Sequence, residues 1–115
     1  MFPVIVLGAL TIAAVYAYFG DNYVSSGEAK RLIKEGRITR VVDVRTAAEY
    51  RMGHYPNALH IPVDKINEKT TTELPKWGIL VYCNTGQRAR FAAEKLEKLG
   101  FVEVYYIAGL YTSLL

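Results

Sequence analysis

The chain has 115 residues, a formal net charge of +3 and a single cysteine, Cys83. A chain of this length builds one small domain around one hydrophobic core. Because the charge is mild and no basic block is interleaved with aromatic residues, a nucleic-acid partner is not expected. One cysteine excludes an internal disulfide framework. With only Cys83, His54 and His60 as soft ligands, no metal site is predicted either.

The first 20 residues form a separate unit, because residues 2–19 contain no charged side chain. As a helix this run spans roughly 27 Å, close to the bilayer hydrocarbon thickness of about 30 Å. We therefore expect a transmembrane helix that anchors the chain, followed by one domain over residues 21–115. The alternatives are a cleaved signal peptide, after which the domain would be exported, and a helix buried inside the domain.

Basic residues follow the apolar run and do not precede it. Lys30, Arg31, Lys34 and Arg37 lie within about 20 residues of its end, and positive charge favours the cytoplasmic side of a membrane helix. This asymmetry predicts a cytoplasmic domain.

Helix and strand patterns alternate along the rest of the chain. Ser25 and Glu28 have the spacing of a capping box, which predicts a helix from there to about residue 35. Strand patterns cover a brief candidate edge strand at residues 23–24 and four longer segments, at 40–44, 58–61, 78–82 and 103–107. Helix patterns cover residues 47–52 and 89–99. The alternation predicts an α/β fold, with a mostly parallel central sheet of about five strands and helices on both faces.

The loop Cys83-Asn84-Thr85-Gly86-Gln87-Arg88 joins a predicted strand to a predicted helix. Ligands of open α/β sheets bind at the carboxyl ends of the strands. Unpaired N–H groups at a helix N-terminus favour the thiolate form of a nearby cysteine. Gly86 lets successive N–H groups converge, and Arg88 offers a planar donor fork to an anion. We expect Cys83 to be a nucleophile and Arg88 to bind an anion. The alternatives are that Cys83 is an inert buried cysteine and that Arg88 is a solvated residue at the start of the helix.

This loop, together with residues 42–50 and 53–62, resembles the motifs of rhodanese domains, in that family's order. The resemblance implies a three-layer rhodanese-like fold in which Cys83 carries sulfur as a persulfide. It also implies that the donor is bound by the rest of the loop, namely Asn84, Thr85, Gly86, Gln87 and Arg88. Asp43 and Arg45 match the family's Asp-x-Arg motif, which implies structural support of the site. Glu49 and Tyr50 are expected to serve in packing and capping.

The expected activity is that of a thiosulfate sulfurtransferase. The Cys83 thiolate would take the outer sulfur of thiosulfate or of a persulfide donor, and pass it to cyanide, a thiol or a protein thiol. Such traffic through a covalent intermediate needs no cofactor. A membrane-tethered module for protein binding or sulfur delivery, with little turnover, is the main alternative. A phosphatase is disfavoured, because in the related phosphatases the loop is one residue longer than Cys83–Arg88.

Two positions depart from the family pattern. Asn57 stands where glycine is common, and Asn is among the residues that best tolerate a positive φ. Ala108 replaces the first glycine of a usual pair. Neither position belongs to the Cys83 loop.

Overall fold

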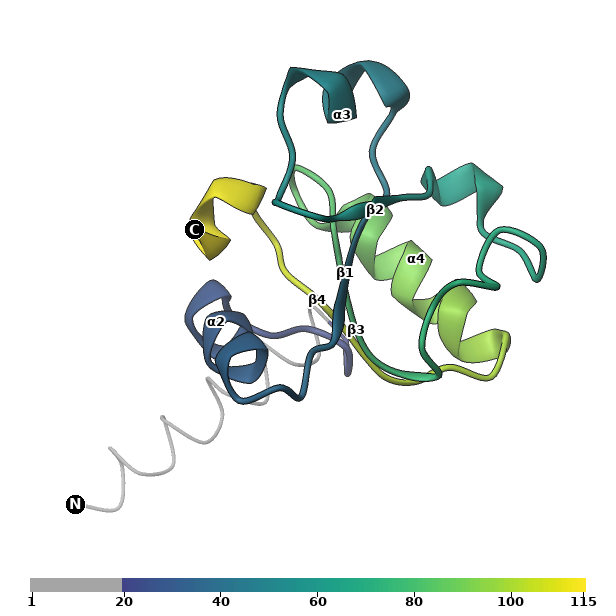
Figure 1. Cartoon of the computed structure of the whole chain (residues 1–115), viewed down its shortest axis with the longest axis horizontal. Helices are drawn as coiled ribbons and strands as arrows, with labels where there is room; N and C mark the ends of the chain where they lie inside the picture. The colour runs from purple at the N-terminus through teal and green to yellow at the C-terminus, as the bar shows by residue number, and fades with distance from the viewer. Residues whose placement is uncertain (1–19) are drawn as a thin grey trace, which may run out of the picture.

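The structure is a computed structural model that describes residues 20–115 (Figure 1). Its four strands are β1 (Arg40–Asp43), β2 (Leu59–His60), β3 (Trp77–Tyr82) and β4 (Val102–Tyr106). They form one sheet in the order β2-β1-β3-β4, and every strand pair is parallel. The predicted α/β fold with a parallel sheet is confirmed.

Helices cover both faces of the sheet, as the alternating pattern predicted. The helices are α2 (Ser26–Lys34), α3 (Ala47–Met52) and α4 (Gln87–Lys98), with short 3₁₀ turns η1 (Val63–Lys65) and η2 (Tyr111–Leu114). Helix α4 packs on one face, while α2 and η2 lie together on the other (Figure 1). Helix α3 lies beyond the carboxyl ends of the strands, on the chain that leaves β1.

The central strand β3 is buried on both faces, which explains its continuous apolar sequence. Ile79 and Val81 pack in the core beneath α4, and Leu80 and Tyr82 pack in the core beneath α2. The apolar face of α4 is made by small residues and one leucine: Ala89, Ala92, Ala93 and Leu96. These small side chains allow the helix to lie close to the strand that leads into Cys83.

The described residues form four strands, one fewer than predicted. At the expected edge position, only Tyr23 forms a parallel bridge, to Tyr106. The segment is too short for a ladder, because Ser25 already caps α2. The Asn22 side chain extends the contact by donating a hydrogen bond to the Val104 carbonyl at 2.9 Å.

The capping box predicted at Ser25 and Glu28 forms only in part. Ser25 Oγ accepts a hydrogen bond from the Glu28 N–H at 3.1 Å, but the Glu28 carboxylate pairs with Arg31 instead of reaching back. A complete capping box occurs at α3, where Thr46 and Glu49 bond to each other's backbone N–H. The Glu28 side chain is partly exposed, so a guanidinium one turn along the helix competes successfully for its carboxylate.

The predicted transmembrane segment at residues 2–19 lies outside the described residues. Across residues 20–115, no helix combines the length and the apolar character needed to cross a bilayer.

Candidate active site

Cys83 follows the last residue of β3 and lies just before α4, where the sequence placed it. Its Sγ accepts hydrogen bonds from the backbone N–H groups of Gly86 at 3.1 Å and Ala89 at 3.4 Å. The N-cap residue of α4 is Gly86, which has no side chain with which to cap the helix. The sulfur therefore takes the place of the capping oxygen and accepts from an otherwise unpaired helix N–H. The side chain has no exposed surface.

Gly86 has a backbone conformation that suits only glycine. Its φ is +102°, and a Cβ at this position would lie 2.9 Å from Ala108 Cα. Both the left-handed backbone and the close approach of Ala108 exclude a side chain here. This geometry directs the Gly86 N–H at the sulfur. Ala108, which replaces the usual glycine at that position, thus packs directly against the loop at Gly86.

Arg88 forms a two-pronged ion pair with Glu49 of α3. Its Nη1 and Nη2 lie 2.7 and 3.0 Å from the two carboxylate oxygens. Asn84 Nδ2 donates to the same carboxylate at 2.8 Å, and the Thr46 N–H donates at 2.9 Å. Hydrogen bonds from Arg88, and then from Thr46, lower the pKa of Glu49 to about 2. Glu49 is therefore ionised throughout the neutral pH range.

A buried ion pair connects β1 to the site. Arg45 Nη2 lies 2.7 Å from Asp43 Oδ2, and neither side chain is appreciably exposed. The Tyr82 hydroxyl donates to Asp43 Oδ2 at 2.6 Å and accepts from the Tyr55 N–H at 3.0 Å. Burial, and then the bond to Asp43, raises the pKa of Tyr82, so its hydroxyl stays protonated. Because Tyr82 directly precedes Cys83, this network fixes the end of β3.

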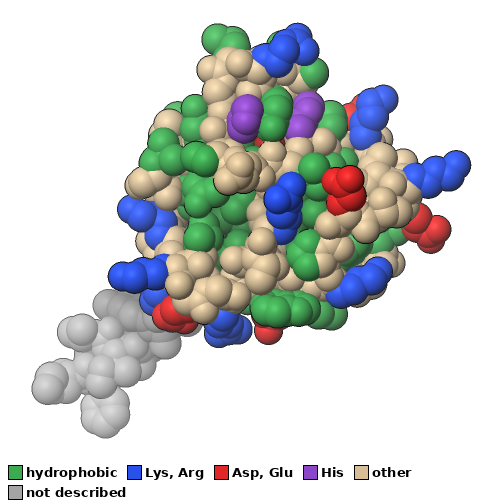
Figure 2. All heavy atoms as spheres, in the orientation of Figure 1, with side chains coloured by type: hydrophobic (Ala, Val, Ile, Leu, Met, Phe, Trp, Pro, Cys, Tyr) green, Lys and Arg blue, Asp and Glu red, His purple; other side chains and the backbone are tan. Residues whose placement is uncertain are grey.

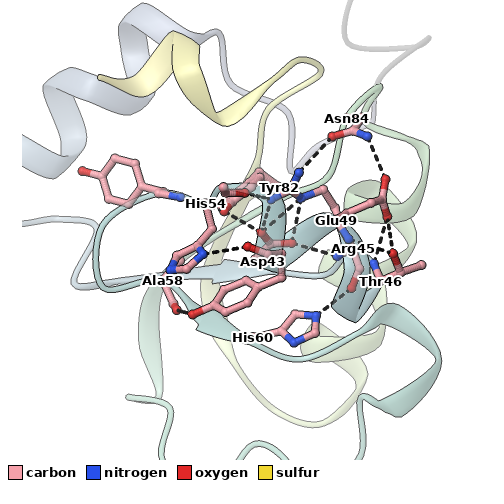
Figure 3. Close-up of polar contacts among 12 residues, drawn as sticks. Asp43, Arg45, Thr46, Glu49, His54, Ala58, His60, Tyr82 and Asn84 are labelled. Carbon is pink, nitrogen blue, oxygen red and sulfur yellow. Dashed lines mark hydrogen bonds and ion pairs between the residues drawn. The ribbon is translucent and has the colours of Figure 1, made fainter.

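Figure 3 shows how Asn84 connects the two ion pairs. The Asn84 amide donates to Glu49, and its Oδ1 lies 3.5 Å from Arg45 Nη1. The remaining Arg45 donors bond to the Asp43 carboxylate and to the Gly53 carbonyl at 2.6 Å. Asp43 and Arg45 thus form a buried ion pair that is connected to the Cys83 loop through Asn84.

The two histidines pack against Tyr50 and bond to the backbone. Their rings stack on the Tyr50 ring with centroid separations of 3.7 Å for His54 and 4.5 Å for His60. His54 Nδ1 lies 2.9 Å from the Tyr50 carbonyl, and His60 Nε2 lies 2.8 Å from the Arg45 carbonyl. Figure 2 shows both rings at the surface of this face. Within residues 20–115, no three His, Cys, Asp or Glu side chains are grouped to hold a metal.

The side chains of the loop after Cys83 differ in exposure. Thr85 and Gln87 are exposed, whereas Asn84 and Arg88 are half-buried between the loop and α3. Residues 83–88 thus form one structural unit, but only part of it surrounds the sulfur. Sequence reasoning missed the ion pair of Arg88 with Glu49, since it assigned Glu49 to packing and capping alone. The available signal was Arg88 itself, because a cation at a helix N-terminus requires an anionic partner.

A model of the rhodanese-like domain family matches residues 25–114. The chain belongs to the rhodanese-like family. The thiosulfate sulfurtransferase GlpE of Coxiella burnetii is 35% identical over 86 residues, which cover 75% of this chain and 79% of that protein. The human single-domain sulfurtransferase TSTD1 is similar in structure, with a TM-score of 0.63, 27% identity and coverage of 82% of this chain and 95% of that one. The BH2092 protein of Bacillus halodurans has a TM-score of 0.70 and 31% identity, and the match covers 93% and 79% of the two chains.

In this rhodanese-like fold, the cysteine sulfur therefore accepts hydrogen bonds from two backbone N–H groups. Two arginines at the loop, Arg45 and Arg88, are each paired with a carboxylate. Backbone N–H groups fixed in this way stabilise negative charge on sulfur without any reorganisation. The arrangement suits a sulfur nucleophile and an anionic persulfide better than an inert thiol, which would be surrounded by apolar groups alone.

Proposed function

We propose that the protein is a sulfurtransferase in which Cys83 carries sulfane sulfur as a persulfide. The observation that supports it most directly is the pair of N–H groups, from Gly86 and Ala89, that point at the Cys83 sulfur. The printed name of the Coxiella relative, a thiosulfate sulfurtransferase, makes thiosulfate the first donor to test. Cyanide and thiols, including protein thiols, are the acceptors.

In the donor step, the Cys83 thiolate attacks the outer sulfur of thiosulfate. Its electron pair forms the new S–S bond, and the old S–S bond breaks with its pair leaving on sulfite. Cys83 is left as an anionic persulfide that the two N–H groups stabilise. In the acceptor step, a thiolate or cyanide attacks the terminal sulfur, and the Cys83 thiolate leaves. The six-residue loop of Cys83–Arg88 supports sulfur chemistry over phosphate chemistry by its resemblance to rhodaneses.

The test is the intact mass of the full chain after incubation with thiosulfate, and again after cyanide. We expect a gain of one sulfur atom that cyanide removes, and no gain in Cys83→Ser. A folded wild-type chain that gains no sulfur from thiosulfate or from any other sulfane-sulfur donor would refute the proposal. The protein-binding module would then be the better hypothesis. Hydrolysis of an aryl phosphate would point to a phosphatase instead.

We also propose that residues 2–19 anchor the protein in a membrane with the rhodanese-like domain on the cytoplasmic side. The support is the uncharged, apolar run in the sequence and the basic residues that follow it. The protein should stay in the membrane pellet after alkaline carbonate extraction, and protease added to intact cells should leave the domain uncut. Release of a shortened chain outside the cell would favour a signal peptide.

A further inference from the structure

Among residues 20–115, three arginines in or near the Cys83 loop are each paired with a carboxylate of the same chain. Arg88 pairs with Glu49, and Arg45 pairs with Asp43. Arg90, further along α4, has Nε 3.7 Å from a Glu94 carboxylate oxygen. A site selected to attract a small dianion would be expected to leave a guanidinium for it, since charge lining a cleft raises the local concentration of its counter-ion.

Two groups interact with the Arg88 guanidinium: the Glu49 carboxylate, in the ion pair described above, and more weakly the Cys83 sulfur. Both groups act on its guanidinium: the pKa of Arg88 is raised, first by its hydrogen bonds to Glu49 and in smaller part by Cys83. Both terminal nitrogens of Arg88 are thus bonded to the Glu49 carboxylate, so a donor's anionic group would have to share them. The Asn84 amide, which lies in the same loop, also donates to Glu49.

The ion pair is placed where a donor can compete with it. The side chains of Arg88 and Glu49 are 35% and 29% exposed. Ion pairs with this much contact with water contribute little net stability, and so a bound anion can share or displace them at modest cost. The fixed negative charge of Glu49 nevertheless remains beside the donor and repels it in proportion to the donor's own charge.

We infer that Glu49 sets the charge selectivity of the site, favouring singly charged sulfane-sulfur donors over dianionic thiosulfate. This inference rests on the proposed sulfurtransferase function and specifies its donor class. Glu49 acts through Arg88 and is therefore a positioning and selectivity residue that does not touch the transferred sulfur. Removal of its charge should help thiosulfate more than a monoanion of the same shape.

Methanethiosulfonate is a matched probe, because a methyl group replaces one charged oxygen of thiosulfate. The donor step is otherwise the same. The Cys83 thiolate attacks the outer sulfur, the donor S–S bond breaks, and its electron pair leaves on methanesulfinate in place of sulfite. Each donor leaves one anionic persulfide on Cys83. A difference between the two donors in half-saturating concentration therefore reports on charge.

Glu49→Gln is the variant of choice, because glutamine can also complete a capping box with Thr46. The fold of α3 should thus be retained while the charge is lost. Glu73→Gln is the matched control. Glu73 is exposed in the segment that leads into the amino end of β3, whereas Cys83 follows the carboxyl end of that strand. It removes the same charge at a distance from the loop.

The measurement is the rate of sulfur gain on Cys83, by intact mass in single-turnover conditions, against donor concentration. In Glu49→Gln, the half-saturating concentration of thiosulfate should fall about 3- to 10-fold, the order expected when one partly exposed unit charge near a dianion is removed. That of methanethiosulfonate should fall by a smaller factor, and the limiting rates should stay unchanged. The advantage should shrink in high salt, because screening weakens the repulsion. Glu73→Gln should behave as wild type.

The wild-type chain provides a second measurement that does not depend on the variant folding. Its half-saturating concentration should be lower for methanethiosulfonate than for thiosulfate. Equal values, or a preference for thiosulfate, would overturn the inference, as would a Glu49→Gln variant in which both donors change by the same factor. These outcomes leave the sulfurtransferase function intact. A wild-type chain that gains no sulfur from either donor refutes the function itself.

Discussion

Replacement of Asp43 with alanine is expected to lower the free energy of unfolding by about 3–5 kcal/mol. The substitution leaves the Arg45 guanidinium buried without its carboxylate, and it removes the acceptor of the Tyr82 hydroxyl. A buried charge without a partner costs much more than the pair contributes. Urea unfolding followed by the fluorescence of Trp77, the single tryptophan, measures the change.

The matched control is Asp64→Ala, which removes an exposed aspartate from η1. It should change the free energy of unfolding by no more than about 0.5 kcal/mol. A loss below about 1 kcal/mol in Asp43→Ala would mean that water reaches Arg45 and solvates it. The ion pair would then be a surface pair in energetic terms.

Gly86→Ala is expected to slow sulfur gain on Cys83 by about 10²- to 10³-fold, the loss typical of removing one backbone donor to a developing anion. At φ +102°, the new Cβ would lie 2.9 Å from Ala108 Cα, so the loop must shift. That shift takes the Gly86 N–H away from Sγ, which it now approaches to 3.1 Å. Single-turnover mass measurements with thiosulfate give the rate.

Gly100→Ala separates backbone strain from the close contact. Gly100 has φ +99°, nearly that of Gly86, but a Cβ there would meet no atom within 4 Å among the described residues. This variant should lose about 1–2 kcal/mol of stability from the left-handed conformation alone, with the rate of sulfur gain unchanged. An equal loss of rate in the two variants would show that Gly86 contributes flexibility and that its N–H is not essential.

The succession of strands and helices could be predicted from the sequence, because local patterns determine it. The helix over residues 47–52 agrees with α3 to the residue, and the predicted strand over 78–82 differs from β3 only by Trp77. Asn57, predicted to tolerate a positive φ, has φ +65°. The fifth strand was predicted wrongly, because its two residues have strand character but the neighbouring cap of α2 leaves no length for pairing.

The position of Cys83 between a strand and a helix was also predictable, since it depends on residues that are close in the sequence. The partners of the site were not. Glu49 lies on α3 and Arg88 on α4, and Tyr82 reaches back to Asp43 across the β1–β3 pairing. Such pairings depend on how elements pack. A capping-box glutamate looks the same in sequence whether or not its carboxylate also binds an arginine.

The contact between the first and last segments of the described chain has a consequence for how the domain is made. Tyr23 bridges Tyr106, and Ser26 Oγ lies 2.8 Å from Ser113 Oγ where α2 meets η2. All strands are parallel, so each pairing also waits for a crossover to be completed. During synthesis, Tyr23 and Ser26 therefore emerge well before their partners, Tyr106 and Ser113. Until β4 and η2 have emerged, the sheet lacks an edge strand and α2 lacks the segment that packs beside it, which leaves apolar surface open to aggregation.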